Sequence, residues 1–331
     1  MKAITQDRYG SSDVLEFRDV DAPLPADDEV QVRVHAAAVN AYDWHIMRGD
    51  PYLARLMTPG QFGFGGPRRK IRGRDFAGTV SAVGKDVTRF QVGDEVFGDL
   101  GTADGAFAEY ACVRHDLVEP KPANLTFEQA AAIPLAGLTA LKGLRDVGQL
   151  RAGQHVLING ASGGVGTYAV QIAKSLGADV TGVCSTRNVG LVRSLGADHV
   201  IDYTQEDFTT GEQRYDLVFD LVGNRSLAEC RRALTPTGTL VLSGGGVSGG
   251  GSFFGPMGLM ISGQLFARFV SQRVVVLDTA PNGEILAALR KLAEAGTLKP
   301  VIDRTYPLVE TAAAVHYLEI EHARAKVVVT V

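Results

Sequence analysis

The feature that most constrains the fold is a glycine-rich loop that joins an apolar strand pattern to a helical one. Residues 155–159 read His-Val-Leu-Ile-Asn, residues 160–166 read Gly-Ala-Ser-Gly-Gly-Val-Gly, and a helical pattern follows. This order is typical of the turn that places a pyrophosphate at a helix N-terminus, where backbone amides and the helix dipole favour negative charge. The loop therefore predicts a dinucleotide-binding α/β fold.

Each small residue of this loop has a predicted task. Ala161 replaces the first glycine of the usual dinucleotide pattern, while Gly163 and Gly166 keep its spacing. Gly163 and Gly164 would leave backbone amides open to phosphate oxygens, and Gly166 would let the helix pack closely on the strand. The predicted cofactor-binding residues of the loop are Ala161, Ser162, Gly163, Gly164, Val165 and Gly166.

The residues after the next strand indicate which dinucleotide binds. An NAD enzyme places an acid there, at the carboxyl end of the strand, against the ribose 2′-hydroxyl. In this chain Asp179 stands at the start of the strand, and its end reads Ser185-Thr-Arg187, with no acid until Asp198. Hydroxyls and a guanidinium suit a 2′-phosphate, so Ser185 and Arg187 predict NADP(H). Alternatively, Arg187 is only a solvent-exposed side chain at the start of the following helix.

Strand and helix patterns divide the chain into two domains. Residues 1–123 hold short strands with period-two alternation, which predict a small, largely antiparallel β-barrel. Residues 124–277 alternate apolar strands with helices, which predicts a doubly wound parallel sheet. Residues 278–331 are expected to return to the first domain with a closing strand. The predicted strands of the parallel sheet are residues 155–159, 179–184, 199–201, 216–220, 239–243 and 273–277.

Charge and composition argue against several classes of protein. The net charge is −4, so binding to nucleic acid is not expected. The most apolar window, residues 253–270, is interrupted by glycines, Gln264 and Arg268, so a membrane span is not expected, and a cytoplasmic location fits best. The three cysteines are far apart, which argues against a disulfide framework and a cysteine zinc lobe. A basic stretch, residues 67–74, is either a solvated loop or faces cofactor phosphates.

Residues 39–50 gather polar and reactive side chains in one turn-like passage, Val-Asn-Ala-Tyr-Asp-Trp-His-Ile-Met-Arg-Gly-Asp. This mixture is either the remnant of a metal site or a site that works without metal. The polar donors are Asn40, Tyr42 and His45. A neutral phenol donates a hydrogen bond at pH 7, and an imidazole shuttles protons near neutrality. Alternatively, each is an ordinary loop residue.

The whole chain resembles the medium-chain dehydrogenase/reductase superfamily, and most of all its zinc-independent, quinone oxidoreductase-like branch. The segments that carry the resemblance are Gly73-Arg-Asp-Phe-Ala-Gly-Thr-Val80, Val92-Gly-Asp-Glu-Val-Phe-Gly98, Ile133-Pro-Leu-Ala-Gly-Leu-Thr-Ala140, the loop at 160–166 and Leu195-Gly-Ala-Asp-His-Val-Ile-Asp-Tyr203. The resemblance implies a GroES-like barrel domain, a Rossmann domain and a cleft between them that holds the nicotinamide.

The resemblance also predicts the absence of metal. Zinc-bearing relatives have a Cys-His pair where this chain has Asn40-Ala41, and Gly-His-Glu where it has Gly73-Arg74-Asp75. The third ligand region, residues 131–139, holds no Cys, His, Asp or Glu. Because a catalytic zinc needs three protein ligands, no metal site is expected.

Without a Lewis acid, the expected acceptor is one that spreads incoming negative charge. An unactivated ketone leaves the charge on one oxygen, whereas a quinone or an α,β-unsaturated carbonyl delocalises it. We therefore expect an NADPH-dependent reductase of quinones or enones. Tyr42 is the leading proton donor, with His45 or solvent as alternatives, and the resemblance places Asn40 beside the nicotinamide. Two other functions stay open: reduction of another electron-poor double bond, such as an enoyl thioester or haloacrylate, and NADPH binding without turnover in a structural or regulatory protein.

The resemblance assigns further residues to the cofactor. Thr139 matches a threonine beside the nicotinamide, and Tyr203 matches a tyrosine near the 2′-phosphate in NADPH-using relatives. Ser243 and Gly244 follow a strand end, where open sheets bind ligands, and Lys326 is a further candidate. Residues 249–269 are interpreted as a mobile apolar cover, core packing or a dimer face. A homodimer is expected, with residues 273–277 as its joining edge.

Overall fold

The structure is a computed structural model of the 331-residue chain, and it describes all residues except 51–54, 56–61, 64–65, 244–270 and 322. The chain divides into two compact units: unit 1 is Met1–Leu138 with Ala280–Val331, and unit 2 is Thr139–Thr279. The first division lies beyond the expected residue 123. The reason is that α3 (Phe127–Ala131) and the start of α4 (Pro134–Leu141) pack on unit 1, where Leu135 donates its amide to Oδ1 of Asp75 at 2.9 Å.

Unit 1 is built on a largely antiparallel sheet, as predicted. Among the described residues its strand order is β14-β15-β3-β4-β5-β7, and β6 also pairs with β3. All neighbours run antiparallel except β14 and β15, which are parallel. The strands are β3 (Glu29–Val39), β4 (Asp75–Val83), β5 (Glu95–Asp99), β6 (Tyr110–Arg114), β7 (Val118–Pro120), β14 (Ile302–Pro307) and β15 (Lys326–Thr330). A separate antiparallel pair joins β1 (Lys2–Gln6) and β2 (Leu15–Asp19).

The alternation in β3 shows why this sheet forms. Val30, Val32 and Val34 are at most 2% exposed and lie in the core of unit 1, whereas the residues between them are partly exposed. One face of the strand is therefore apolar and the other polar. β15 pairs with β3, so the closing strand returns to this sheet as the sequence predicts.

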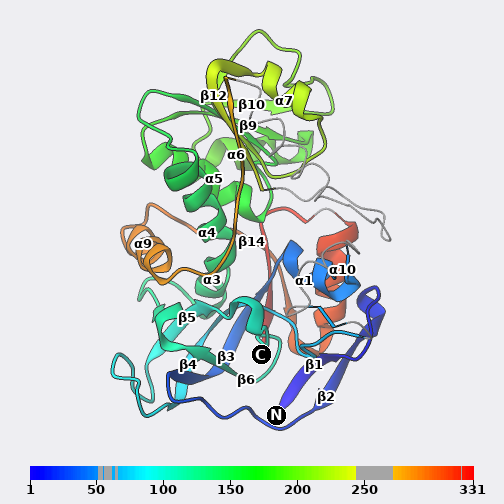
Figure 1. Ribbon diagram of the computed structural model, residues 1–331, viewed down its shortest axis with the longest axis vertical. Coiled ribbons are helices and arrows are strands. Elements are labelled where there is room, and N and C mark those ends of the chain that lie inside the picture. Colours follow the sequence, from blue (N-terminus) through cyan, green and yellow to red (C-terminus); the bar gives the residue numbers. More distant parts are fainter. Residues whose placement is uncertain (51–54, 56–61, 64–65, 244–270, 322) are drawn as a thin grey trace. The chain divides into compact units, whose positions relative to one another are not determined.

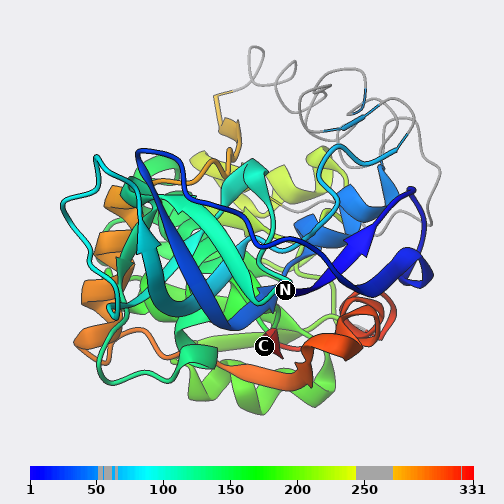
Figure 2. The same ribbon diagram turned by 90° about the horizontal axis from the view of Figure 1, so that it is seen from below.

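Helices flank the sheet of unit 1. In both views α9 (Gly283–Glu294, orange) and α10 (Thr311–Ile320, red) lie on opposite sides of it (Figures 1 and 2). The helix α1 (Ala41–Arg48) follows β3 directly and contacts α10. Short 3-10 turns are η1 (Ser12–Val14), η2 (Gly101–Ala103), η3 (His115–Leu117) and η7 (Leu308–Glu310).

Unit 2 is a parallel sheet with the strand order β10-β9-β8-β11-β12-β13 among the described residues. Because β8 comes first in the chain, the order reverses between β8 and β11, and open α/β sheets bind ligands at the carboxyl ends of strands at such a switch point. The strands are β8 (His155–Asn159), β9 (Asp179–Cys184), β10 (His199–Asp202), β11 (Tyr215–Asp220), β12 (Leu234–Leu242) and β13 (Arg273–Val276). The parallel pairing and the six predicted strand positions are confirmed, although β12 begins earlier than expected.

The helices of unit 2 connect these strands. α5 (Gly164–Ser175) packs against β8 and β9, α6 (Val189–Ser194) against β9 and β10, and α7 (Leu227–Arg232) against β12. A π-helical turn at Lys142–Val147 continues α4, and a 3-10 turn at Thr186–Asn188 precedes α6. The sheet is thus wound in the dinucleotide-binding manner that the glycine loop predicts.

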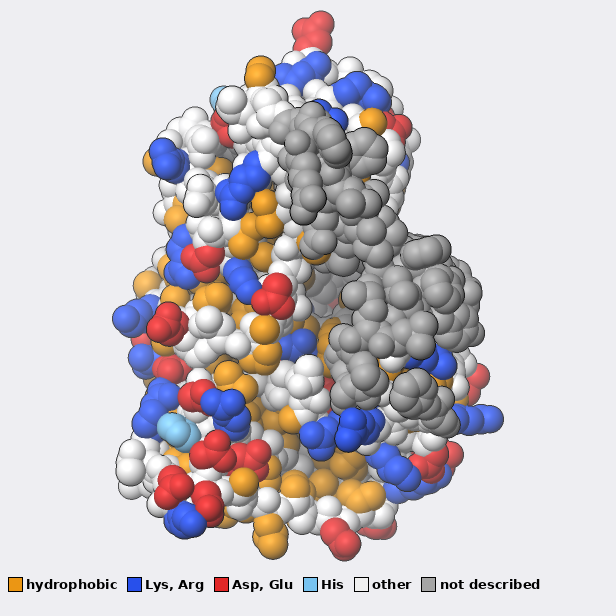
Figure 3. Space-filling view, in the orientation of Figure 1, with side chains coloured by type: hydrophobic (Ala, Val, Ile, Leu, Met, Phe, Trp, Pro, Cys, Tyr) orange, Lys and Arg blue, Asp and Glu red, His pale blue; other side chains and the backbone are white. Residues whose placement is uncertain are grey.

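The described surface is mixed in charge. Figure 3 shows acidic and basic side chains interspersed over the visible face, in keeping with the net charge of −4. Among the helices of the described residues, none combines the length and the apolarity that a membrane crossing requires.

Candidate active site and cofactor site

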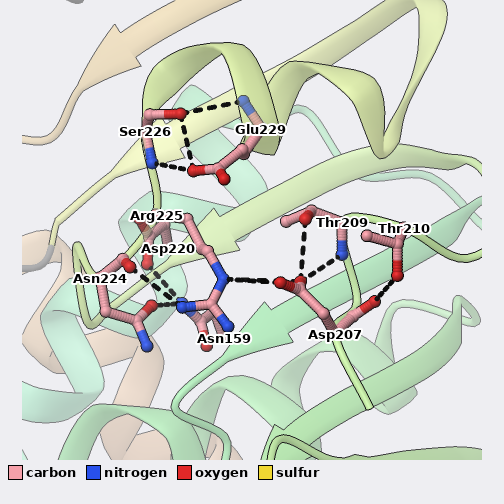
Figure 4. A network of polar contacts seen from close by, with 9 residues as sticks. All are labelled: Asn159, Asp207, Thr209, Thr210, Asp220, Asn224, Arg225, Ser226 and Glu229. Atoms are coloured by element: carbon pink, nitrogen blue, oxygen red, sulfur yellow. Dashed lines mark hydrogen bonds and ion pairs between the residues drawn. The ribbon is translucent and has the colours of Figure 1, made fainter.

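The carboxyl ends of β8 and β11 form a polar cluster at the switch point of unit 2. Asn159 ends β8, and its Nδ2 donates to Oδ1 of Asp220 at 2.9 Å and to Oδ1 of Asn224 at 3.0 Å. Asp220 ends β11, and its Oδ1 also accepts the amides of Val222 and Gly223. Figure 4 shows Asn159, Asp220 and Asn224 pointing toward one another. These bonds hold the loop after β11 beside the strand from which the glycine loop starts.

The same loop is anchored further along. Nε of Arg225 lies 3.3 Å from Oδ2 of Asp207, whose Oδ1 accepts the amide and hydroxyl of Thr209. Ser226 caps α7, and its hydroxyl and amide both donate to Glu229 (Figure 4). These contacts therefore hold the loop after β11 in one position at the carboxyl edge of the sheet.

The glycine loop (residues 160–166) has backbone geometry that requires glycine at two places. Gly160 has a φ of +89°, a left-handed conformation that strains other residues. A Cβ on Gly166 would lie 2.1 Å from the carbonyl oxygen of Gly160, so the first turn of α5 meets the start of the loop at a contact that only glycine permits. At Gly163 the nearest atom to a Cβ would be 3.4 Å away, which leaves space beside the backbone.

The helix α5 starts in this loop with Gly163 as its N-cap. No side chain of the described residues caps it. The first amides of a helix have no acceptor within the helix, and its dipole favours an anion there. The N-terminus of this 12-residue helix therefore fits a pyrophosphate.

Asn188 links the glycine loop to the loop after β9. Its Nδ2 lies 3.1 Å from Oγ of Ser162 and 3.3 Å from Oγ of Ser185. Asn188 is 5% exposed, and its bonds to the two half-buried serines are partly buried. Asn188 is not among the predicted cofactor residues, and the only signal for it in the sequence is its position directly after Arg187. Two predicted cofactor residues, Ser162 and Ser185, are thus held together by one that was missed.

An acid lies next to this loop, at the end of β10. Oδ2 of Asp202 accepts the hydroxyl of Thr186 at 2.5 Å, and its Oδ1 accepts the hydroxyl of Thr204 at 2.8 Å. The hydrogen bond from Thr186 lowers the pKa of Asp202. Asp202 is therefore ionised at neutral pH, and both its oxygens are taken up by threonine hydroxyls.

The remaining predicted cofactor residues lie in different surroundings. Arg187 and Tyr203 are exposed, and the Tyr203 amide donates to the carbonyl of Cys184 at the end of β9. The Ser243 amide donates to the carbonyl of Asp220 at the switch point. Thr139 is buried in α4. Gly244 and residues 249–269 lie outside the described residues.

Residues 41–48 of unit 1 form the helix α1. The prediction of a turn-like conformation for this segment is therefore wrong. Asn40 is the N-cap, and Oδ2 of Asp43 accepts its amide at 2.7 Å. Gly49 ends the helix in the left-handed conformation. The helix was missed because eight residues are too few to establish a helical period, and its first turn is polar.

Asn40, Lys326 and Asp75 form a buried group, here named the Lys326 triad. Nζ of Lys326 donates to Oδ1 of Asn40 at 2.6 Å and lies 3.5 Å from Oδ2 of Asp75. Nδ2 of Asn40 donates to the same Asp75 oxygen at 3.0 Å. The three residues are at most 8% exposed. The ammonium of Lys326, a candidate cofactor residue, also lies 3.4 Å from the Val39 carbonyl, so it is buried within unit 1.

Two opposite charges stabilise each other in this triad. Burial raises the pKa of Asp75, and Lys326 opposes that shift. Burial lowers the pKa of Lys326, and Asp75 opposes that shift in turn. The neighbouring Asp43 differs, because burial and then Asp104 raise its pKa to about 8, and its Oδ1 has no partner among the described residues. Asp43 is therefore mostly protonated at pH 7.

Tyr42 lies beside a second buried cation. The guanidinium carbon of Arg74 is 4.6 Å from the centroid of the Tyr42 ring. Nε and Nη2 of Arg74 donate to the two oxygens of Asp99 at 2.9 and 2.7 Å. Burial works against the charge, but Asp99 outweighs it, so the pKa of Arg74 is raised. The phenol is thus placed against a permanent positive charge.

His45 is neutral in this environment. Burial lowers its pKa to about 4, with a smaller opposing effect from Asp50. Its ring stacks on Trp44 at a centroid distance of 3.7 Å, and its Nδ1 has no partner among the described residues. At pH 7 His45 therefore carries no imidazolium proton to give away.

The basic stretch at residues 67–74 is divided by the fold. Arg68, Arg69 and Lys70 are exposed, as expected of a solvated loop. Arg72 and Arg74 are buried instead, and Arg72 pairs with Asp104 at 2.7 Å. Their carboxylate partners lie about 25 to 32 residues further along the chain, so a local pattern could not reveal them. Within the described part of the chain, no three or more His, Cys, Asp or Glu side chains are grouped so as to hold a metal ion.

Comparisons with known proteins agree with this architecture. Residues 26–123 match the family model of the alcohol dehydrogenase GroES-like domain, and residues 195–329 match that of a zinc-binding dehydrogenase. The chain is 34% identical to a quinone oxidoreductase of Sus scrofa, over 98% of this chain and 95% of that protein. The chain belongs to the quinone oxidoreductase-like branch of the medium-chain dehydrogenase/reductase superfamily.

Other members of this branch are similar over most or all of their length. A 2-methylene-furan-3-one reductase of Solanum lycopersicum is 35% identical, over 99% of this chain and 79% of that protein. The solved quinone oxidoreductase of Coxiella burnetii superposes with a TM-score of 0.86 at 32% identity, covering 100% and 99% of the two chains. The Escherichia coli quinone oxidoreductase, solved with NADPH, has a TM-score of 0.84 at 26% identity, with both chains fully covered. The recognised family and fold class are therefore confirmed.

Proposed function

We propose that the protein is an NADPH-dependent oxidoreductase that reduces a quinone or an α,β-unsaturated carbonyl without zinc. The observation that carries this proposal is the Lys326 triad, because Asn40 and Asp75 lie in the two segments where zinc-bearing relatives have the Cys-His and Gly-His-Glu motifs of their metal site. Relatives named for the reduction of quinones and of a methylene-furanone support the choice of acceptor.

The cofactor would be held by unit 2. The N-terminus of α5 and the glycine loop suit the pyrophosphate, and the exposed Arg187 suits the 2′-phosphate. Asn188 would keep Ser162 and Ser185 in place beneath these groups. When bound, NADPH supplies a hydride to an electron-poor carbon.

Zinc does not suit the residues that replace its ligands. The Asn40 amide and the Asp75 carboxylate are already bound to the Lys326 ammonium. A divalent cation there would be repelled by that ammonium and by the nearby Arg74 guanidinium. The remaining means of stabilising an anionic product are hydrogen-bond donors, each of which contributes about 3–4 kcal/mol when well placed.

Tyr42 is the proposed proton donor. Its hydroxyl would give a proton to the oxygen of the reduced acceptor, which leaves a tyrosinate that solvent reprotonates. His45 is the weaker candidate because its pKa of about 4 leaves the ring neutral at pH 7. Asn40 would act through the triad, since its amide is already engaged by Lys326 and Asp75.

The Tyr42→Phe variant tests this assignment. Loss of a general acid should lower kcat about 100-fold or more, with little change in the affinity for NADPH. The measurement is oxidation of NADPH at 340 nm with 2-cyclohexenone as acceptor. A kcat equal to that of the unsubstituted protein would remove Tyr42 from the reaction.

A panel of acceptors separates this function from the two alternatives. Quinones and enones should be reduced faster than an enoyl thioester, a haloacrylate or a saturated ketone. Preference for the thioester or the haloacrylate would favour the second function. Binding of NADPH without oxidation by any acceptor would favour a structural or regulatory role. The homodimer and the cytoplasmic location stay predictions.

A further inference from the structure

Arg74 is more rigidly held than a cation at a protein surface. Its guanidinium makes two parallel bonds to Asp99, and both side chains are at most 6% exposed. Oδ1 of Asp99 also accepts the amide of Gly101 at 2.8 Å, which fixes the carboxylate to the backbone. Paired, charged bonds of this kind are the strongest and most directional that a guanidinium makes.

This fixed guanidinium lies over one aromatic ring, that of Tyr42, at 4.6 Å. A cation over an aromatic face is attracted to it, and the attraction grows when both groups are removed from water. The same positive charge favours a phenolate over a neutral phenol by Coulomb attraction. Arg74 therefore both orients the ring and stabilises the form that remains after Tyr42 gives up a proton.

A second buried ion pair in unit 1, that of Arg72 and Asp104, serves as a comparison for Arg74. Arg72 donates to Asp104 at 2.7 Å, to Oε1 of Gln6 at 3.0 Å and to the Arg69 carbonyl at 2.6 Å. These contacts join neighbouring loops and strands. Arg74 resembles Arg72 in burial and pairing but differs in the ring of Tyr42.

We propose that Arg74 is the positioning residue of Tyr42, and that it replaces with a protein-borne charge the cation which zinc-bearing relatives hold at this site. The inference rests on the proposed function, in which Tyr42 donates the proton. The proton moves from the Tyr42 hydroxyl to the anionic oxygen of the reduced acceptor, and the negative charge left on Tyr42 faces the Arg74 guanidinium. Asp99 holds the guanidinium, and solvent returns the proton.

Other charged groups near Arg74 set the background of this effect. The carboxylates of Asp75 and Asp104 both interact electrostatically with the Arg74 guanidinium. Asp43 and His45 lie on the same helix, α1, as Tyr42. The cation that lies over the Tyr42 ring is the Arg74 guanidinium. The test must therefore remove the Arg74 charge without leaving Asp99 unpaired.

The double variant R74Q/D99N meets this requirement, because an amide–amide hydrogen bond can replace the ion pair. With NADPH and 2-cyclohexenone, kcat at pH 7 should fall about tenfold while KM for the enone stays within about twofold. The high-pH limb of the kcat profile should move upward by about one pH unit, because the phenolate is no longer favoured. The single variant R74K keeps a positive charge, so the high-pH limb of its kcat profile should lie within a few tenths of a pH unit of that of the unsubstituted protein.

Two comparisons show whether Arg74 acts through Tyr42. In a Y42F background, R74Q/D99N should change kcat by less than about twofold, since no phenol remains to be influenced. The control R72Q/D104N removes a buried pair of the same kind, and it should lower Tm without moving the pH limb. An unmoved limb in R74Q/D99N, or a tenfold loss that persists in Y42F, would overturn the role of Arg74. Full turnover in Y42F alone would instead show that the proposed function has the wrong donor.

Discussion

The glycine loop of unit 2 and the Lys326 triad of unit 1 show two ways in which a chain builds a candidate site. The glycine loop is formed by seven consecutive residues, and its properties are those of the backbone: a left-handed φ at Gly160 and a contact too close for a Cβ at Gly166. The triad joins residues 40, 75 and 326, and its properties are those of buried charges.

The difference is one of energetics as well as of sequence distance. A glycine loop avoids strain and leaves amides open, so it costs little when no ligand is present. A buried ammonium and carboxylate must each be removed from water, and only their partners offset that cost. Substitutions in the triad should therefore damage stability, whereas substitutions around the loop should damage binding, except at Gly166, where a Cβ has no room.

The largest effect is expected from Lys326→Met. The variant leaves the Asp75 charge buried without its cation, which should lower the free energy of unfolding by about 3–5 kcal/mol. The loss should be smaller at pH 5 than at pH 8, because a protonated Asp75 no longer needs the ammonium. Urea unfolding at both pH values measures it.

A matched control for this prediction is Lys2→Met. Lys2 pairs with Asp19 in the same unit, but both side chains are largely exposed, so the change should cost far less stability than Lys326→Met. Equal losses in the two variants would contradict the contrast between buried and exposed charge.

Gly166→Ala tests the backbone side of the comparison. The new Cβ would lie 2.1 Å from the Gly160 oxygen and 2.7 Å from Ala161, so the helix or the loop must shift at a cost of about 3 kcal/mol. Gly190→Ala, in α6, meets no atom within 4 Å and should be neutral or slightly stabilising. Thermal unfolding distinguishes them, and similar Tm values would show that Gly166 is not sterically required.

His45, in unit 1, should make the free energy of unfolding depend on pH. The imidazole has a pKa of about 4 in the folded protein and about 6.5 when unfolded, so between these values the unfolded chain binds more protons. The free energy of unfolding should therefore fall as the pH drops from about 6.5 to about 4, by up to about 3 kcal/mol relative to His45→Gln. Parallel stability curves for the two proteins would mean that the ring is not held neutral.

The smallest of these effects is expected from Arg187→Asp. Because Arg187 is exposed, its replacement should leave Tm nearly unchanged and weaken NADPH by about 2 kcal/mol, roughly 30-fold, with little effect on NADH. Titration of both cofactors by calorimetry measures the ratio. An equal loss for the two would remove Arg187 from the phosphate site.

The sequence predicted the parts of the molecule that follow from local patterns. The strands of unit 2 lie where their apolar runs indicate, and β3 alternates buried valines with polar residues as its period requires. The glycine loop could be assigned because strand, loop and helix are contiguous. Asn188 was missed because an asparagine after a strand end has many ordinary explanations.

The polar network of unit 1 could not be predicted in the same way. Lys326 pairs with Asn40 across 286 positions, and Arg74 pairs with Asp99 across 25. No local pattern links such residues, and only the sheet brings β15 beside β3 and β4 beside β5. The sequence identified Asn40 and Tyr42 as candidates, but not the charges that surround them.

The most direct test of the whole account compares 2-cyclohexenone with cyclohexanone, using NADPH and protein dialysed against a chelator. The two acceptors differ only in the carbon–carbon double bond that is conjugated with the carbonyl group in 2-cyclohexenone. We expect a kcat/KM at least about 100-fold higher for the enone, unchanged by chelation, because a delocalised charge needs less stabilisation than a localised alkoxide and is within what the hydrogen-bond donors of unit 1 supply. Equal or faster reduction of cyclohexanone, or activity that is lost on chelation and restored by zinc, would contradict the account.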